Sequence, residues 1–210
     1  MAEVPLEEWL DAVNREALVS FPTDTVPALA VRPQAGDRIY QLKQRSQTKP
    51  LILMGATWSQ LRPYVIGPAP DVAQWQQLAN RHWPGALTLV LPASDRVPAA
   101  INPQQTGTIG LRVPNHPLAR YLLERTGPLA TTSVNRSGQP PLETMTAIAQ
   151  TFPSVQVLSA NALAQLYPAL TGQPPPAADR PQGSGLPSTV ARWTGSSWEI
   201  LRQGAVTLQI

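Results

Sequence analysis

The chain contains no cysteine among its 210 residues. Without thiols, a disulfide framework, a thiolate metal site and thiol redox chemistry are all excluded. Histidine is nearly as scarce, since His82 and His116 are the only two, and a pair so far apart without accompanying acids makes a weak ligand set. We therefore predict that no residue of the protein forms a metal site.

Long apolar runs and nucleotide-loop motifs are also missing. No stretch approaches about 18 apolar residues, and the acidic amino terminus MAEVPLEEWLDAV lacks the basic and apolar segments of a signal peptide. We expect no membrane as a partner and a cytoplasmic location. No GxGxxG or Walker A sequence occurs, so neither a Rossmann cofactor site nor a P-loop is supported.

Lysine is rare in a chain that is otherwise mildly basic. The net charge is +3, and fourteen of the sixteen cationic side chains are arginine, which leaves only Lys43 and Lys49. This excess suits any polyanionic ligand and identifies none. Two lysines so close together suggest a chemical role, although an arginine-rich codon bias explains the same pattern equally well.

Helical and strand patterns alternate along the chain. We predict helices over residues 5–17, 37–44, 57–61, 71–81, 116–125 and 144–151. We predict strands over residues 50–54, 87–91, 109–113, 129–132 and 155–158, two short apolar runs joined by a polar turn in LVSFPTDTVPALAV, and a hairpin from residues 189–192 and 198–202. This interleaving indicates one α/β or α+β domain, residues 1–210, with a mixed sheet.

Proline makes up 24 of the residues, and much of the excess falls in residues 168–187. That segment has neither helical nor strand periodicity, so we predict a long mobile loop within the domain. Structureless loops of this length are usually functional or disordered. Our hypothesis is that residues 174–185 form a lid that excludes water from the site.

The first candidate site is the turn FPTDT, which places the hydroxyls of Thr23 and Thr25 beside the carboxylate of Asp24. Such a turn suits a small polar substrate or a metal-bound water, and an ordinary hydrogen-bonded turn explains it as well. Arg112 is a second candidate, because a cation within the apolar strand IGLRV needs a counter-ion. That counter-ion is either a protein acid or a carboxylate ligand.

The segment LKQRSQTKP carries Lys43 and Arg45 at the exit of a helix. If the chain extends after residue 43, the two side chains point to the same side, and an anion relieves their repulsion. A lysine with an arginine is a common pairing where a triphosphate is held. A solvated helix end is the alternative explanation.

Small hydrogen-bonding residues follow the apolar strand near residue 130. Ser133 and Asn135 belong to the run TTSVNRSG, which suits the reading of a nucleotide through hydroxyl, amide and backbone groups, or forms an ordinary turn. Ser188 and Arg202 lie beyond the proline-rich loop. They complete a polar wall if the terminal hairpin folds against the first strands.

These motifs resemble, in order and across nearly the whole chain, the YrdC family of L-threonylcarbamoyladenylate synthases. The segments that carry the resemblance are FPTDTVPALAV, LKQRSQTKPLILM, HWPGALTLVLPA, IGLRVPNHPLARYL, PLATTSVNRSGQPP and LPSTVARWTGSSWEILRQGAV. The length is similar to the short form, without an extra carboxy-terminal domain. Two positions depart from the common pattern: Pro27 and Ala28 replace Tyr and Gly, and Met54 stands where longer relatives often have His.

The resemblance implies a twisted α/β sheet around a concave, positively charged cavity that binds ATP, L-threonine and bicarbonate. By this resemblance, Lys43 and Arg45 would be catalytic residues that bind the ATP phosphates. Ser133 and Asn135 would also bind these phosphates. Ser188 and Arg202 would contact the nucleotide. Thr23, Thr25 and Arg112 would bind threonine. Mg²⁺ would be held mainly by the ATP phosphates. The implied partners are the downstream proteins that transfer the threonylcarbamoyl group to tRNA.

Two other functions fit parts of the same sequence. A non-catalytic module that binds double-stranded RNA or tRNA would also use a basic concave surface, although the charge is small and neither an RGG tract nor an RNP-like aromatic pair occurs. A carbamoyl-adenylate-forming relative from another pathway has similar motifs, usually within a longer chain.

Overall fold

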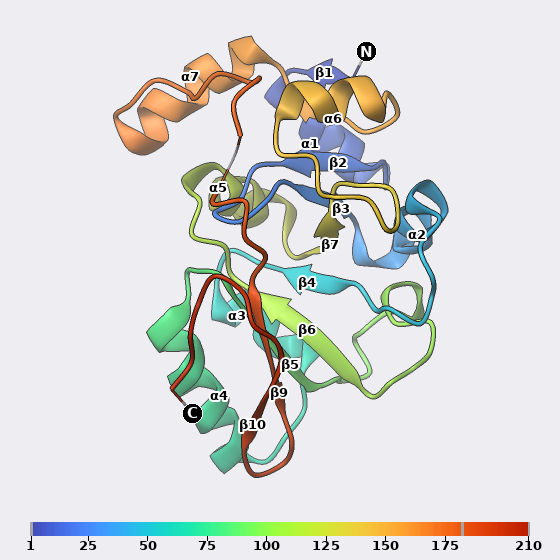
Figure 1. Cartoon of the computed structure of the whole chain (residues 1–210), viewed down its shortest axis with the longest axis vertical. Coiled ribbons are helices and arrows are strands. Elements are labelled where there is room, and N and C mark those ends of the chain that lie inside the picture. Colours follow the sequence, from blue (N-terminus) through green and yellow to red (C-terminus); the bar gives the residue numbers. More distant parts are fainter. Residues whose placement is uncertain (1, 182, 210) are drawn as a thin grey trace.

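The central feature of the fold is a twisted eight-stranded mixed sheet (Figure 1). The computed structural model describes residues 2–181 and 183–209. The strands are β1 Glu3–Val4, β2 Val19–Phe21, β3 Ala28–Val31, β4 Ile52–Met54, β5 Leu87–Pro92, β6 Thr108–Arg112, β7 Leu129–Ser133, β8 Val157–Leu158, β9 Thr189–Trp193 and β10 Trp198–Arg202. The helices are α1 Leu6–Asn14, α2 Asp37–Lys43, α3 Trp58–Leu61, α4 Ala69–His82, α5 Pro117–Thr126, α6 Met145–Thr151 and α7 Ala160–Thr171, with short 3₁₀ turns at Pro33–Ala35, Arg62–Tyr64 and Ala99–Ile101.

The strand order of the large sheet is β10-β9-β5-β6-β4-β7-β3-β2. The pairs β4–β6 and β5–β9 are parallel, and the other neighbours are antiparallel. A separate parallel pair joins β1 to β8. The predicted mixed sheet and the predicted terminal hairpin are therefore confirmed.

The middle strands bury one face and leave the other for a ligand. In β5, Leu87, Leu89 and Leu91 belong to the larger apolar core, whereas the intervening Thr88 and Val90 line a cavity. In β6 the same alternation places Ile109 and Leu111 in the core. Successive residues of a strand face opposite sides, so the sequence pattern itself assigns the two faces.

The other end of the sheet is covered on both faces. Strand β3 places Leu29 in the larger core and Ala28 in a second core formed with α1, α5 and α7. Trp9 of α1 is fully buried there, edge-on to Phe21 of β2. Figure 1 shows these helices above the sheet, with α4 beside β9 and β10 at the opposite end.

The sequence predicted most elements within a few residues, but it missed β1 and α7, and the start of the predicted loop was wrong. The loop expected from Pro168 onward begins later, because α7 continues through Pro168 to Thr171 and ends at Gly172. Its residues Ala162, Leu163 and Tyr167 are buried against α5, and this packing offsets the weak helical signal of a segment that contains proline. Gln182, part of the predicted loop and lid, lies outside the described residues, as do both terminal residues of the predicted 1–210 domain.

Candidate functional site

A cavity of about 700 Å³ lies over the concave face of the sheet. Its wall is formed by alternate residues of β4, β5, β6, β7 and β9, together with the loops that precede β3 and β9. Four arginines line it, namely Arg45, Arg112, Arg192 and Arg202. No Asp or Glu occurs among the described residues of the lining, so the cavity favours an anionic ligand.

Lys43, Ser133 and Asn135 are joined by hydrogen bonds beside this cavity. The Lys43 ammonium donates to the Ser133 carbonyl at 2.5 Å and to Asn135 Oδ1 at 2.6 Å, and Ser133 Oγ donates to Asn135 Oδ1 at 2.7 Å. Ser133 lines the cavity, while Lys43 and Asn135 lie behind the lining. Lys43 therefore holds the β7 loop in its cavity-facing conformation.

Burial changes the titration of Lys43. Only 2% of the residue is exposed, and this desolvation, followed by the charge of Arg45, lowers its pKa from 10.5 to about 8. Among residues 2–181 and 183–209 the ammonium has protein acceptors but no acidic partner. A phosphate at this end of the cavity would favour its charged form.

Arg45 reaches the cavity by a different geometry from the one that the sequence suggested. The chain does not extend after Lys43, because Gln44 adopts a left-handed conformation with φ 51° that ends α2. The guanidinium then donates to the Lys49 carbonyl at 3.2 Å and lines the cavity. The condition under which residues 43 and 45 would point to the same side, an extended chain after Lys43, is therefore not met.

Arg112 lies at the end of β6 and is 4% exposed. Its three donor groups bond to Gly85 O at 3.1 Å, Thr25 Oγ1 at 2.8 Å and Asp24 Oδ1 at 2.6 Å. Burial lowers the pKa of Arg112, and the charge of Asp24 acts in the opposite direction. The counter-ion that the sequence required is therefore a protein acid, with the guanidinium still forming part of the cavity wall.

The Thr23–Thr25 turn is held together by its own side chains. Thr23 Oγ1 lies 3.1 Å from Thr25 Oγ1, donates to the Val26 carbonyl and accepts from the Thr25 amide. Both threonines are 1% exposed. The hydrogen-bonded turn offered as the alternative explanation is therefore present, and it also places Thr25 in the cavity wall beside Arg112.

Ser188 and Arg202 form the wall on the side of the terminal hairpin. The Arg202 guanidinium donates to the Ser188 carbonyl at 2.8 Å, and Ser188 Oγ lies 2.8 Å from Thr88 Oγ1 of β5. Burial lowers the pKa of Arg202. The hairpin does not fold against the first strands: β9 pairs in parallel with β5, at the opposite edge of the sheet from β2 and β3, and Ser188 and Arg202 still line the cavity from there.

Thr131 was missed as a separate site residue. The residue lines the cavity, but its hydroxyl is buried and has no hydrogen-bond partner. A buried polar group without a partner costs free energy, and a ligand atom can satisfy this hydroxyl only if the wall shifts to expose it. The alternation of Thr131 with buried Ala130 in β7 was the sequence signal that could have found it.

The three residues that depart from the common family pattern lie in the same cavity wall. Pro27, Ala28 and Met54 all line the cavity. Gly110 forms its floor between β4 and β5, where a Cβ would lie 2.7 Å from Ile52 Cγ2. Small or unbranched residues at these points leave room over the middle strands.

Residues 2–181 and 183–209 contain no group of three or more His, Cys, Asp or Glu that could hold a metal ion. The oxygen donors that the side chains of the lining offer are hydroxyls, among them Thr25, Thr88 and Ser133. Mg²⁺ commonly keeps several waters and binds through substrate phosphates. The donor set thus fits a magnesium ion held by a phosphorylated ligand rather than by a protein cage.

The fold and cavity define a class of protein in which a mixed sheet presents arginines and hydroxyls to an anionic ligand. A family profile described as "Telomere recombination", for the Sua5, YciO and YrdC proteins, matches residues 11–166. The chain belongs to this Sua5/YciO/YrdC family, which confirms the resemblance found in the sequence.

Individual relatives agree with the family. Over 135 residues, 61% of this chain, it is 41% identical to a threonylcarbamoyl-AMP synthase of Bacillus subtilis, but the match spans only 37% of that protein. Over 147 residues, 68% of this chain, it is 34% identical to a threonylcarbamoyl-AMP synthase of Escherichia coli, of which 76% is covered.

A solved structure of Pyrococcus abyssi Sua5 complexed with L-threonine also matches. The TM-score is 0.76 at 29% identity, and the match covers 93% of this chain and 52% of that one. The chain thus spans about half of Sua5 and little more than a third of the Bacillus relative.

Proposed function

We propose that this protein is an L-threonylcarbamoyladenylate synthase, a nucleotidyltransferase that joins L-threonine, bicarbonate or CO₂, and ATP. Its products would be threonylcarbamoyl-AMP and pyrophosphate, and proteins acting downstream would transfer the threonylcarbamoyl group to tRNA. A cytoplasmic location goes with this role. Among the described residues no helix is long and apolar enough to cross a membrane.

The observation that carries the proposal is the position of two different cationic groups in one cavity. In one group, Arg45 and Ser133 line the cavity and Lys43 lies behind them, bonded to the Ser133 carbonyl; in the other, Arg112 bonds to Thr25. The first group suits a phosphate chain, and a buried arginine beside a hydroxyl suits an amino-acid carboxylate. Threonylcarbamoyl-AMP synthases of other organisms, and Sua5 with its bound threonine, support this assignment.

The chemistry consists of two balanced steps. The amine of threonine attacks CO₂ and loses a proton, which gives a carbamate. A carbamate oxygen then attacks the α-phosphorus of ATP, a new P–O bond forms, and the bond to the β-phosphate oxygen breaks with release of pyrophosphate. Both steps need close positioning and charge neutralisation more than a general base, which agrees with the lack of acids in the described lining.

In this scheme Lys43 and Arg45 act as catalytic residues by neutralising charge on the departing pyrophosphate. Ser133 and Asn135 bind the phosphates from the β7 side, and Ser188 with Arg202 contact the nucleotide from the hairpin side. Two of the three N–H donors of Lys43 bond to Ser133 O and Asn135 Oδ1, which leaves the third for a phosphate. Magnesium, bound mainly through phosphate oxygens and water, supplies further charge neutralisation.

Threonine would lie against Arg112 and the Thr23–Thr25 turn. Two of the five N–H bonds of the guanidinium are not used in contacts with Gly85, Thr25 and Asp24, and these suit a carboxylate. Thr25 Oγ1 offers a further contact, and Thr23 supports it. Pro27 and Ala28 shape the neighbouring wall.

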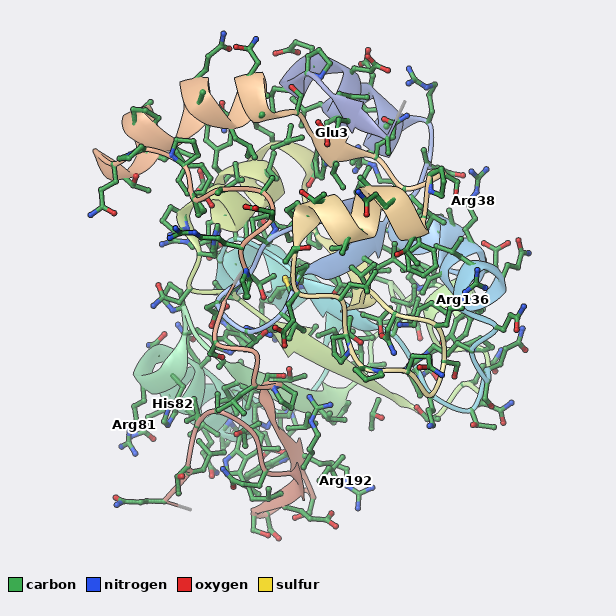
Figure 2. All side chains as sticks on the ribbon, turned by 45° about the horizontal axis from the view of Figure 1, so that its top comes forward. Glu3, Arg38, Arg81, His82, Arg136 and Arg192 are labelled. Carbon is green, nitrogen blue, oxygen red and sulfur yellow. The ribbon has the colours of Figure 1, made fainter. Side chains whose placement is uncertain are left out.

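RNA binding without catalysis is less well supported. Such a module needs basic side chains gathered into one patch or stripe. The labelled arginines Arg38 and Arg136 lie on one side of the view, and Arg81 and Arg192 lie elsewhere (Figure 2). Of the cavity arginines, Arg45, Arg112 and Arg202 instead line a space suited to a small ligand, whereas the exposed Arg192 pairs with Glu199.

The direct test is an omission experiment on pyrophosphate release from ATP. We expect release that requires both threonine and bicarbonate and stops when either is left out. Binding to tRNA with a steep dependence on salt, and no pyrophosphate under any combination, would instead support the RNA-binding module.

A further inference from the structure

Residues Gly183–Gly185, which we call the strap, lie directly on the Thr23–Thr25 turn. The Ser184 amide donates to the Asp24 carbonyl at 3.1 Å, and the Gly185 amide donates to the Thr25 carbonyl at 2.9 Å. Gly185 also lines the cavity. A short exposed segment of the chain is thus bound through its backbone to the turn at the amino-acid end of the site.

The strap can come so close only because Gly183 has no side chain. Its φ is +81°, and a Cβ built on it would lie 2.4 Å from the Thr25 carbonyl oxygen and 2.6 Å from that of Thr23. Real Cβ atoms essentially never approach so closely, so any larger residue must displace the strap or the turn. The positive φ alone would not require this, because an alanine can adopt it at a modest cost.

The turn under the strap holds the guanidinium of Arg112. Thr25 Oγ1 accepts from Nη1 at 2.8 Å, and Asp24 Oδ1 accepts from Nη2 at 2.6 Å. The carbonyls that anchor the strap belong to these same two residues. A displacement of the strap would therefore reach Arg112 through Asp24 and Thr25.

We propose that Gly183 is a positioning residue for the amino-acid half of the site, and that the strap fixes the Thr23–Thr25 turn so that Arg112 presents its free edge to the substrate carboxylate. The strap amides bond to Asp24 and Thr25, whereas the group proposed to bind phosphate is joined through the bonds of Lys43 to Ser133 and Asn135. Its effect is consequently selective, acting on threonine and not on ATP. The proposal rests on the proposed function only in naming threonine as the carboxylate ligand.

The test compares Gly183→Ala with Gly172→Ala. Gly172 has a similar φ of +70° but nothing within 4 Å of a built Cβ, so both variants carry the same backbone strain and only one displaces the strap. We expect Gly183→Ala to raise the KM for threonine about tenfold, with the KM for ATP within about twofold, because sub-ångström misplacement weakens an oriented contact. Gly172→Ala should leave both values unchanged.

A second pair of variants, at Ser184, tests the backbone bond of the strap without adding a Cβ at position 183. Ser184→Pro eliminates the amide that bonds to the Asp24 carbonyl, whereas Ser184→Ala keeps it and loses only the hydroxyl that accepts from the Leu186 amide. We expect Ser184→Pro to raise the KM for threonine as Gly183→Ala does. Ser184→Ala should resemble the unmodified protein.

Hydrogen exchange separates failure of this proposal from failure of the proposed function. Without any substrate, the Ser184 and Gly185 amides should be protected in the unmodified protein and exchange faster in Gly183→Ala. If these amides are protected and exchange faster in Gly183→Ala, but the protein has no activity with threonine, then the strap does hold the turn and only the assignment of threonine as the ligand fails. Equal KM values for threonine in Gly183→Ala and Gly172→Ala, or a larger change for ATP than for threonine, would overturn the positioning role.

Discussion

The carboxylate of Asp24 lies 2.6 Å from the Arg112 guanidinium, although 88 positions separate the two residues in the chain. Their side chains are 16% and 5% exposed, respectively, so the pair is largely shielded from water. Asp24 itself is not part of the cavity lining, whereas Arg112 is. The acid therefore supports the arginine from outside the cavity and leaves the cavity face of the guanidinium to a ligand.

Removal of Asp24 should destabilise the fold strongly. Asp24→Ala leaves a buried cation without its counter-ion, and we expect a loss of about 3 kcal/mol in the free energy of unfolding. The matched control is Glu199→Ala, which removes the acid of the exposed pair with Arg192, whose side chains are 46% and 47% exposed. That loss should stay below about 1 kcal/mol. Urea unfolding of both variants measures the difference, and equal losses would refute the structural role of Asp24.

Arg45 and Lys43 should respond differently to replacement by alanine. Arg45→Ala should lower kcat about 100-fold with little change in stability, since removal of one charge-stabilising group has that scale of effect. Arg38→Ala, on the exposed surface of α2, is the control and should keep full activity. Unchanged turnover in Arg45→Ala would remove the phosphate assignment.

Lys43→Ala should reduce both activity and stability. The side chain is buried and bonds to Ser133 O and Asn135 Oδ1, so its loss removes a donor from both, with Ser133 Oγ still donating to Asn135 Oδ1, at a cost of about 1–3 kcal/mol. Turnover and urea unfolding, measured on the same preparation, test both effects. A fully stable but inactive Lys43→Ala protein would show that the lysine does not support the β7 loop.

ATP binding should weaken as the pH rises through about 8. The pKa of Lys43 is lowered to about 8, so its ammonium is lost above that pH, and affinity should fall about tenfold by pH 9 if only the charged form binds phosphate. The contribution of Lys43 to the stability of the fold changes with pH in the opposite direction. Between about pH 8 and 10.5 the unfolded chain binds more protons at this residue, so its contribution to folding improves as the pH rises. Calorimetric titration of ATP across this range checks the first effect, and pH-independent affinity would contradict it.

Thr131→Val should separate ligand binding from folding. The hydroxyl of Thr131 is buried with no partner, so its removal should leave the stability of the empty protein unchanged or raise it by up to about 1 kcal/mol. Its loss should lower kcat/KM about fivefold to tenfold, because a ligand would lose one hydrogen bond. Thr126→Val is a useful comparison, since that buried hydroxyl bonds to Gly127 O and lies outside the cavity lining. Destabilisation by Thr131→Val would argue against the ligand role.

Sequence patterns located most of the site because small motifs lie next to well-defined strands. The strand preceding Ser133 and Asn135 was evident from its apolar run, and so was the strand that carries Arg112. Contacts between residues far apart in the sequence could not be predicted from these patterns. Nothing local to Asp24 indicates that it bonds to Arg112, and the left-handed Gln44 that turns Arg45 into the cavity has no glycine or asparagine to mark it.

Packing also explains what the sequence did not reveal about the segment before β9. The composition near Pro168 favoured a loop, but the buried face of α7 continues the helix past that proline. The docking of Gly183 on the carbonyls of Thr23 and Thr25 depends on segments more than 150 residues apart. Such contacts come from the folded arrangement of the chain rather than from local propensity.

The most direct test of the proposed function is the fate of labelled bicarbonate. The protein, incubated with ATP, Mg²⁺, L-threonine and ¹³C-bicarbonate, should form an adenylate whose mass contains AMP, threonine and the labelled carbon, as measured by mass spectrometry. Arg45→Ala should form far less of it. Turnover of ATP with no labelled adenylate, or an adenylate that contains threonine without the labelled carbon, would contradict the account.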